Sequence, residues 1–130
     1  MLTKLPDVTE EPNAVVRPWV VLELLVGTLP DITPPYRFVV GFDPASRLGR
    51  VSTLIVEHDP VTRRVRTRSG RTYELSGPPA LDADAWLVWQ KQFGAVRFRD
   101  ATADFWPGYE PGSAKVVDTR VAELLDALRK

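Results

Sequence analysis

The sequence predicts a small α+β domain in which an antiparallel, strongly bent sheet or a small barrel-like meander, of about five or six strands, packs against two helices. Up to about residue 76, short runs rich in Val, Leu and aromatic residues alternate with Pro- and Gly-containing turns, which is typical of strands. Two later segments repeat their apolar residues with helical spacing. A length of 130 residues fits one hydrophobic core, so we expect a single domain over residues 1–130.

The chain begins with a polar arm and two predicted strands. Residues 1–17 should form a loose N-terminal arm, with residues 14–16 placed to add to a sheet edge. Residues 19–26 and 36–42 are rich in Val and aromatic side chains, which favours strands. Residues 28–35 contain three prolines and are predicted to form the loop that joins these strands.

A meander of three strands is predicted after a turn region at residues 43–50. The turn signals Asp-Pro at residues 59–60 and Ser-Gly at residues 69–70 divide this segment. Its register follows from separating apolar from charged faces, with a four-residue loop at 59–62 and a loop that ends at a left-handed Gly70. The expected pairs are Val65 with Tyr73, Arg64 with Glu74, Val56 with Val65, and Glu57 with Arg64.

The first predicted helix covers residues 82–93. Asp82 is suited to cap its N-terminus, and Gly94 follows its last turn. One face carries three aromatic residues that should pack on the sheet: Trp86, Trp89 and Phe93. Residues 95–99 alternate like a short strand, and residues 100–117 are expected to be irregular.

The second predicted helix covers residues 119–129, with Asp118 or Thr119 as its cap. Leu87 and Val88 of the first helix point away from the aromatic face. They need a second cover, which is either this final helix or a partner chain. The final helix has its own apolar stripe, formed by Val121, Leu124, Leu125 and Leu128.

Composition excludes several classes of site. The chain has no Cys, which excludes disulfides and zinc–thiolate sites, and its single His excludes a multi-histidine metal site. It contains no phosphate-binding glycine loop and no nucleophile elbow. Adjacent residues at a hairpin end point in different directions, so we interpret His58 and Asp59 as turn residues rather than a catalytic pair. We therefore expect a protein that is not an enzyme and has no catalytic residue, no metal and no cofactor.

The N-terminus carries acidic residues and no apolar run of the secretory type. The most apolar stretch, residues 19–26, is too short for a transmembrane helix, which needs about 20 residues. We therefore expect a cytoplasmic protein with no membrane partner.

An Arg-rich hairpin is the most visible charged feature of a chain with no net charge. Residues 45–75 contain seven Arg against three acids. One interpretation is an anion-facing ribbon that binds nucleic acid phosphates through Arg66, Arg68 and Arg71. The other is a solvated sheet face with cross-strand ion pairs, in which Arg64 lies between two acids and leaves Arg66 and Arg68 free.

Two aromatic side chains, Trp106 and Tyr109, lie in a loop bounded by Pro and Gly residues. Loop aromatics often anchor protein interfaces, so both are candidate binding residues. The alternative is a lid that folds back on the core.

Residues 49–79, with the sequence GRVSTLIVEHDPVTRRVRTRSGRTYELSGPP, resemble a segment of short, uncharacterised bacterial proteins, many of them cargo of phages, plasmids and integrated elements. The similar residues are Arg50-Val51-Ser52, the run from Thr67 to Arg71, Tyr73, and Gly77-Pro78-Pro79. This β-hairpin segment spans about a quarter of the chain. The resemblance implies no known activity, but it does suggest a mobile-element accessory factor, such as an anti-CRISPR-like inhibitor of a host defence complex.

Taken together, these observations predict a non-enzymatic binding protein that acts on a macromolecular partner by covering its surface. A protein partner is the first hypothesis, with contact through the hairpin tip, the Trp106–Tyr109 loop, or both. The alternative is a nucleic-acid-binding module that uses the Arg-rich hairpin.

Overall fold

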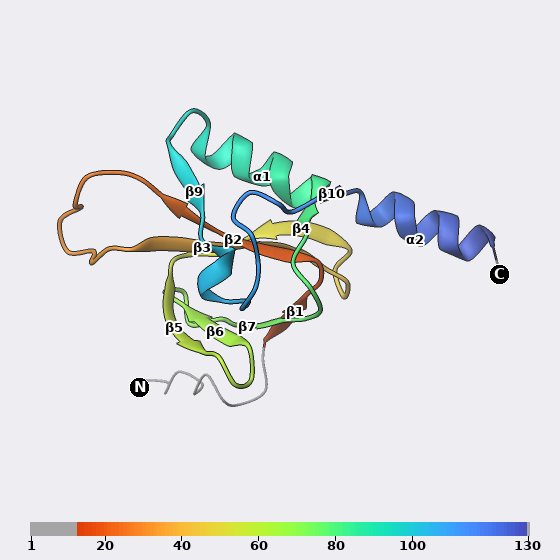
Figure 1. The fold of residues 1–130 in the computed structure, drawn as a ribbon, viewed down its shortest axis with the longest axis horizontal. Coiled ribbons are helices and arrows are strands. Elements are labelled where there is room, and N and C mark those ends of the chain that lie inside the picture. The colour runs from red at the N-terminus through yellow and green to blue at the C-terminus, as the bar shows by residue number, and fades with distance from the viewer. Residues whose placement is uncertain (1–12, 130) are drawn as a thin grey trace.

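The structure is a computed structural model that describes residues 13–129 (Figure 1). These residues form short strands, two α-helices and one 3₁₀ helix. In chain order they are β1 (Ala14–Val16), β2 (Trp19–Leu24), β3 (Tyr36–Asp43), β4 (Leu48–Val51), β5 (Ile55–Asp59), β6 (Arg64–Thr67), β7 (Thr72–Leu75), β8 (Leu81–Asp82), α1 (Ala83–Phe93), β9 (Phe98–Asp100), η1 (Thr102–Asp104), β10 (Val116–Val117) and α2 (Thr119–Leu128).

The strands form two four-stranded sheets, in the orders β1-β7-β6-β5 and β4-β3-β2-β9, and a two-stranded sheet β10-β8. All pairings are antiparallel except β1–β7 and β10–β8, so the predicted α+β class is confirmed. The strands outnumber the expected five or six, and within residues 13–129 the sheets do not close into a barrel. Each four-stranded sheet therefore keeps two edges.

Residues 48–59 enter two different sheets, whereas the sequence predicted a turn at 43–50 followed by the first strand of the meander. At this corner, the main-chain N–H of Ser52 donates to the oxygen of Val39 (2.9 Å), and the Ser52 hydroxyl accepts from the Val39 N–H (2.9 Å). The buried Ser52 thus holds the chain at β3 while it turns from β4 into β5. A strand break at an ordinary Val-Ser-Thr sequence carries no turn signal.

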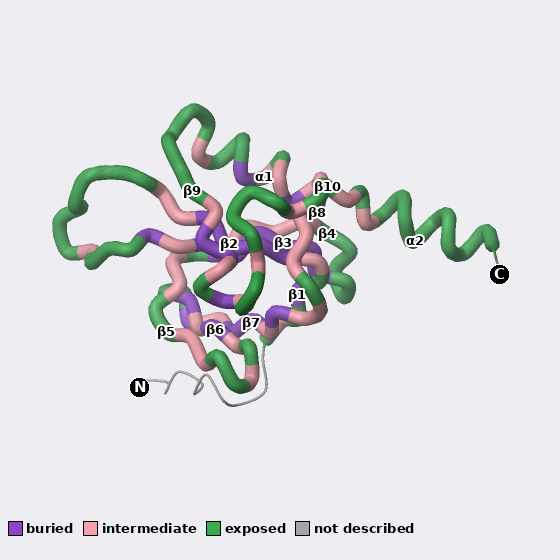
Figure 2. Tube along the Cα trace, viewed as in Figure 1, coloured by how far each residue is buried: buried purple, intermediate pink, exposed green. Residues whose placement is uncertain are grey.

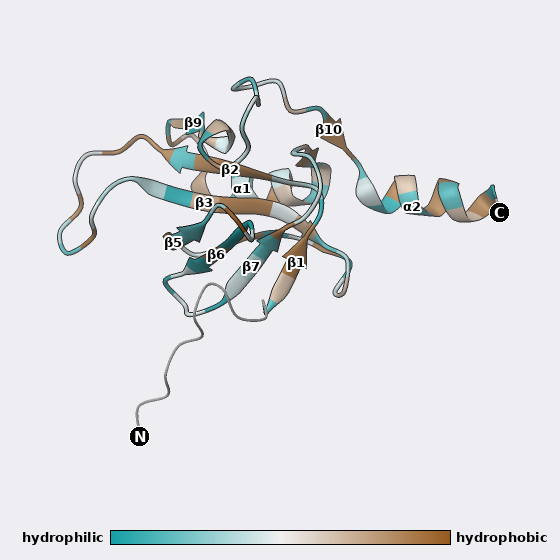
Figure 3. Ribbon diagram, turned by 60° about the horizontal axis from the view of Figure 1, so that its bottom comes forward, coloured by the Kyte–Doolittle hydropathy of each residue, from teal (hydrophilic) through white to brown (hydrophobic). Residues whose placement is uncertain are grey.

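Two hydrophobic cores lie on opposite faces of the sheet that contains β2 and β3. Val21 and Val39 point into the core between the two sheets, whereas Val20 and Val40 point toward α1. Both faces of these strands are covered, which explains their continuous apolar sequence. Figure 2 shows the same strands as the buried centre of the molecule, and Figure 3 shows the contrast with the hydrophilic strands β5 and β6.

Helix α1 forms as predicted. Asp82 caps it by accepting from the Ala85 N–H (2.9 Å), and Gly94 ends it with a positive φ of 54°. Trp89 is buried and packs edge-on against Phe38, with 5.7 Å between ring centroids. The other two aromatic residues of the predicted face are half-buried against the same core, so the stripe does pack on the sheet.

Helix α2 also forms as predicted, with Asp118 as its cap. It leaves the body near the start of α1 and points away from it (Figure 1), with every described residue exposed except its first, Thr119. Leu87 of α1 stays 55% exposed. The final helix therefore does not cover Leu87, contrary to one of the two expectations.

One predicted register is confirmed and the other is wrong. Val65 faces Tyr73 and Arg64 faces Glu74, and Gly70 adopts a positive φ of 90°. On the other side Val65 faces His58, not Val56. The same displacement of two residues affects the charged pairs. Glu57 was predicted to face Arg64, but Glu57 faces Arg66 and Asp59 faces Arg64.

The displaced register has a local cause. The turn between β5 and β6 occupies residues 60–63, because Arg63 takes the left-handed conformation at φ 56°. The Asp59 carboxylate accepts from the Val61 N–H (3.0 Å) and fixes the start of this turn. A bulge between Ile55 and Glu57 then shifts the remaining pairs.

The two ends of the chain match the sequence analysis in part. Residues 14–16 add to a sheet edge as expected, and residues 1–12 of the predicted arm lie outside the described residues. The strand expected at 95–99 occupies Phe98–Asp100. No helix within residues 13–129 is long and apolar enough to cross a membrane.

Candidate binding groove

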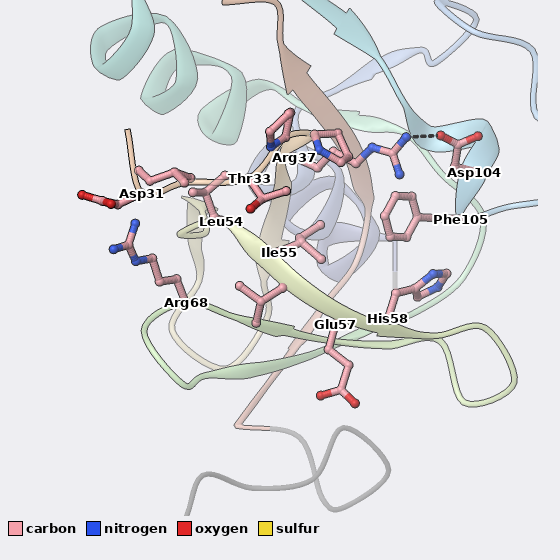
Figure 4. Close-up of a pocket in the computed structure, with 14 residues that line it drawn as sticks. Asp31, Thr33, Arg37, Leu54, Ile55, Glu57, His58, Arg68, Asp104 and Phe105 are labelled. Atoms are coloured by element: carbon pink, nitrogen blue, oxygen red, sulfur yellow. Dashed lines mark hydrogen bonds and ion pairs between the residues drawn. The ribbon is translucent and has the colours of Figure 1, made fainter. Parts of the chain in front are cut away.

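An open groove of about 580 Å³ lies beside strand β5, between this strand and the loop that joins β2 to β3 (Figure 4). We call it the β5 groove. Apolar and charged side chains both line it. The lining residues are 31–35, Arg37, 54–58, Arg68, Asp104 and Phe105.

Strand β5 is an edge strand, and its main chain faces the groove at two positions. The Thr67 N–H donates to the oxygen of Arg71 (2.9 Å), so the main chain of Thr67 is directed to β7. Its partner Ile55 must then point its own N–H and C=O away from β6. Val65 lies two residues earlier on β6 with the same orientation, so its partner His58 also directs its main chain outward. Both Ile55 and His58 line the groove.

At one end of the groove, acidic groups pair with arginines. Arg37 contacts Glu23 at 2.9 Å and Asp104 at 2.5 Å. Burial alone would raise the pKa of Glu23, but hydrogen bonds from Arg99 and Arg37 hold that pKa below its ordinary value. These groups therefore hold β2, β3 and η1 together, at one end of the groove.

His58 presents an uncharged ring to the groove wall. Its ring packs on Phe105 with 4.4 Å between centroids, and its Nε2 is buried without a hydrogen-bond partner among residues 13–129. Burial lowers the pKa of His58, the neighbouring Asp59 opposes this effect, and the positive charge of Arg37 adds to it. At neutral pH the ring is thus mainly uncharged.

Of the three candidate arginines, only Arg68 lines the groove. Arg66 forms an ion pair with Glu57 at 2.5 Å, so the expectation that it is free was wrong. The cause is the displaced β5–β6 register, which sets Glu57 opposite Arg66. Arg71 lies half-buried at the hairpin tip outside the groove, and neither Arg68 nor Arg71 forms an ion pair with a described residue.

The Trp106–Tyr109 loop folds back on the body, as the lid alternative predicted. Trp106 packs edge-on against Trp19, with centroids 6.2 Å apart, and the Arg63 guanidinium lies 4.1 Å from the centre of its ring. The Tyr109 hydroxyl donates to Asp100, and burial together with that carboxylate raises the pKa of Tyr109 to about 12. The loop thus meets the hairpin at Arg63, the opposite end from the tip.

Asp100 at the end of β9 fastens this loop. Its carboxylate accepts from the Thr102 hydroxyl (2.5 Å), the Thr102 N–H (3.0 Å), the Gly112 N–H (2.9 Å) and the Tyr109 hydroxyl. Burial would raise the pKa of Asp100, but these hydrogen bonds hold it below its ordinary value. The two aromatic candidates are thus structural parts of the body in this conformation.

Sequence reasoning missed most of the groove. His58 was interpreted only as a turn residue, and Arg37 and Phe105 were assigned no role. The available signal was the proline-rich loop at 28–35, since binding residues often lie on loops. Nothing in the sequence placed that loop beside β5.

Neither a cluster of metal ligands nor a related protein identifies a ligand for the described residues. Within residues 13–129 no group of three or more His, Cys, Asp or Glu side chains is placed to hold a metal ion. No protein-family model, curated protein or solved structure matches the chain.

Proposed function

We propose that this chain is a non-enzymatic binding protein that takes an extended segment of a partner protein into the β5 groove. The observation that carries the proposal is an edge strand whose outward main-chain groups, at Ile55 and His58, face a groove lined by both apolar and charged side chains. An extended peptide can add to such an edge as a further strand, with main-chain hydrogen bonds for affinity and side-chain contacts for selectivity.

The loop opposite β5 supports an open edge. Prolines have no N–H to donate, and Pro34 and Pro35 lie in this wall of the groove. The wall therefore cannot form a regular ladder with β5 and leaves the edge to another chain. Val56, which is 57% exposed on β5, offers apolar surface for that chain.

The mode of action follows from occupancy alone. A segment held in the groove is withdrawn from its other contacts, so the protein acts by covering a surface. If the resemblance of residues 49–79 to mobile-element proteins extends to function, the partner is a component of a host defence complex.

Nucleic-acid binding is the second candidate, favoured by the absence of ion pairs to Arg68 and Arg71 among the described residues. Its weakness is the pairing of the other strand arginines. Arg66 pairs with Glu57, and Arg64 lies 3.7 Å from Glu74, so little net charge remains along the ribbon.

A peptide titration tests the first candidate. Random 12-residue peptides displayed on phage are selected on the whole protein, and a synthetic winner is titrated while amide NMR shifts are recorded. We expect the largest shifts at residues 54–58. Methylation of alternate peptide nitrogens should abolish binding where those N–H groups pair with β5. Shifts confined to other surfaces, or no selected peptide, would contradict the proposal.

Arg68→Ala and Arg71→Ala form a matched pair, because both residues lie at the hairpin tip and only Arg68 lines the groove. We expect Arg68→Ala to weaken peptide binding by about tenfold, the range for a hydrogen bond to a charged group, and Arg71→Ala to leave it unchanged. A single-stranded oligonucleotide serves as the second probe. If it binds and each variant lowers the salt slope by about one, the nucleic-acid alternative holds.

A further inference from the structure

Among residues 13–129, the apolar stripe of α2 is exposed along its whole length. The exposed fractions are 48% for Val121, 60% for Leu124, 47% for Leu125 and 73% for Leu128. The helix has only ten residues, and a helix this short is marginal in water without packing. A helix with this pattern normally has its stripe covered.

The body cannot provide the cover while the base of α2 stays in place. The base is held by polar contacts with α1 and its cap and with the β3–β4 turn. These are Thr119 to Asp82 at 2.6 Å, Arg120 to Asp84 at 3.2 Å, and Glu123 to Arg47 at 3.2 Å. They direct the polar face to the body, so the stripe points elsewhere.

We propose that α2 pairs in an antiparallel arrangement with α2 of a second copy of this chain. With the two-fold axis between residues 124 and 125, Leu124 meets Leu125 of the second copy and Val121 meets Leu128. Beside the stripe, Arg120 then lies next to Ala127 of the second copy. All three contacts are compatible with a close helix pair.

The charges of α2 agree with this arrangement. Arg129 lies opposite the small Ala122 of the second copy, so like charges do not meet at either flank. Glu123 is turned away toward Arg47. A polar face with charges of both signs also differs from the Lys- and Arg-rich face of a helix that lies on a membrane.

The antiparallel direction follows from how α2 leaves the body. Its N-terminus is at the body and its C-terminus is distant (Figure 1). A parallel pair would place both bodies at the same end of two helices about 15 Å long, whereas an antiparallel pair separates them. Two helices of ten residues should bury less surface than a standard interface, which buries about 800 Å² per partner. We therefore expect a weak, concentration-dependent dimer.

Sedimentation equilibrium tests the dimer. The mass should rise from 14.6 kDa toward twice that value as concentration increases. The double variant Leu124→Glu, Leu125→Glu should stay at the monomer mass, with unchanged fluorescence from the tryptophans of the body. Leu87→Glu is the matched control, since Leu87 is also exposed but lies on α1, and it should dimerise like the natural chain.

Cysteine pairing tests the direction, because the chain has no cysteine of its own. Val121→Cys and Leu128→Cys are oxidised separately and as a mixture. The antiparallel pair predicts a disulfide mainly between the two different variants, since the thiols must come close to react. Self-linked dimers of each variant would overturn the antiparallel arrangement. A monomer at every concentration, or a dimer lost in Leu87→Glu and kept in the α2 variant, would overturn the proposal as a whole.

Discussion

The two helices of this protein have similar local sequences and opposite surroundings. Each starts at an Asp whose carboxylate accepts from the N–H three residues later, at 2.9 Å for Asp82 and 3.1 Å for Asp118. Each is amphipathic and about three turns long. Yet α1 buries its apolar face against β2 and β3, whereas α2 leaves its face in solvent.

The difference shows that capping and periodicity specify a helix without specifying its cover. Helix α1 has, in addition, two tryptophans and Phe93 that pack on the sheet. Gly49 on β4 also lets the helix approach the sheet closely. What α2 has instead is a set of polar contacts at one end. Such contacts fix a direction but exclude little apolar surface from water.

The largest expected effect is the loss of the α1 anchor. Trp89→Ala removes a buried ring from the core between α1 and the sheet, which should cost about 3–5 kcal/mol of the free energy of unfolding. Leu124→Ala on α2 should change it by less than about 0.5 kcal/mol, as expected at an exposed site. Urea unfolding of both variants measures the contrast, and equal losses would break the comparison.

A smaller effect concerns the close approach of β4 to α1. A Cβ at Gly49 would lie 2.2 Å from the Ala85 nitrogen and 2.6 Å from the Asp84 carbonyl carbon, so the backbone must move. Gly49→Ala should therefore cost about 1–3 kcal/mol. Gly27→Ala is the control, because nothing lies within 4 Å of a Cβ there. Thermal unfolding at matching temperatures for the two variants would contradict close packing at Gly49.

The two caps should differ less. Asp82 is buried and serves both Ala85 and Thr119, so Asp82→Ala should cost about 1–2 kcal/mol of global stability. Asp118→Ala should leave global unfolding nearly unchanged and speed amide exchange within α2 only, since that helix can open by itself. Hydrogen exchange combined with urea unfolding distinguishes the two. Global destabilisation by Asp118→Ala would show that α2 is part of the cooperative core.

The smallest effect is a response to pH. The pKa of His58 is lower in the folded chain than its ordinary value of 6.5, so the unfolded chain binds the proton more readily. The resulting stability is complete above about pH 6.5 and is lost as the pH falls from there toward the folded pKa. Urea unfolding between pH 7.5 and about 5 should show this loss in the natural chain, and His58→Gln should remove that part of it. Amide exchange within α2, corrected for the intrinsic pH dependence, should not follow it.

The sequence was sufficient where a turn residue and two faces agreed. Gly70 fixed the turn between β6 and β7, and separating Tyr73 and Val65 from the charged face fixed the pairs. At the preceding turn the left-handed residue is Arg63, a residue type that rarely adopts this conformation. The predicted turn was therefore one residue too early, at 59–62 instead of 60–63. That single error reversed the assignment of Arg66 from free to paired.

The groove could not be predicted because it depends on contacts between distant segments. Arg68 was singled out from charge, but its place beside the 31–35 loop results from how the two sheets pack. Phe105 and His58 meet for the same reason. Local patterns also cannot decide whether Trp106 anchors a partner or closes on Trp19.

The attachment of α2 also determines how the protein responds to force. A pull on α2 loads its hydrogen bond from Thr119 to Asp82 and the ion pairs of Arg120 and Glu123, none of which belongs to the two apolar cores. These few polar links at the base of a projecting helix should yield before the sheets do. Under tension α2 would therefore act as a release point, detaching while the rest of the fold stays closed.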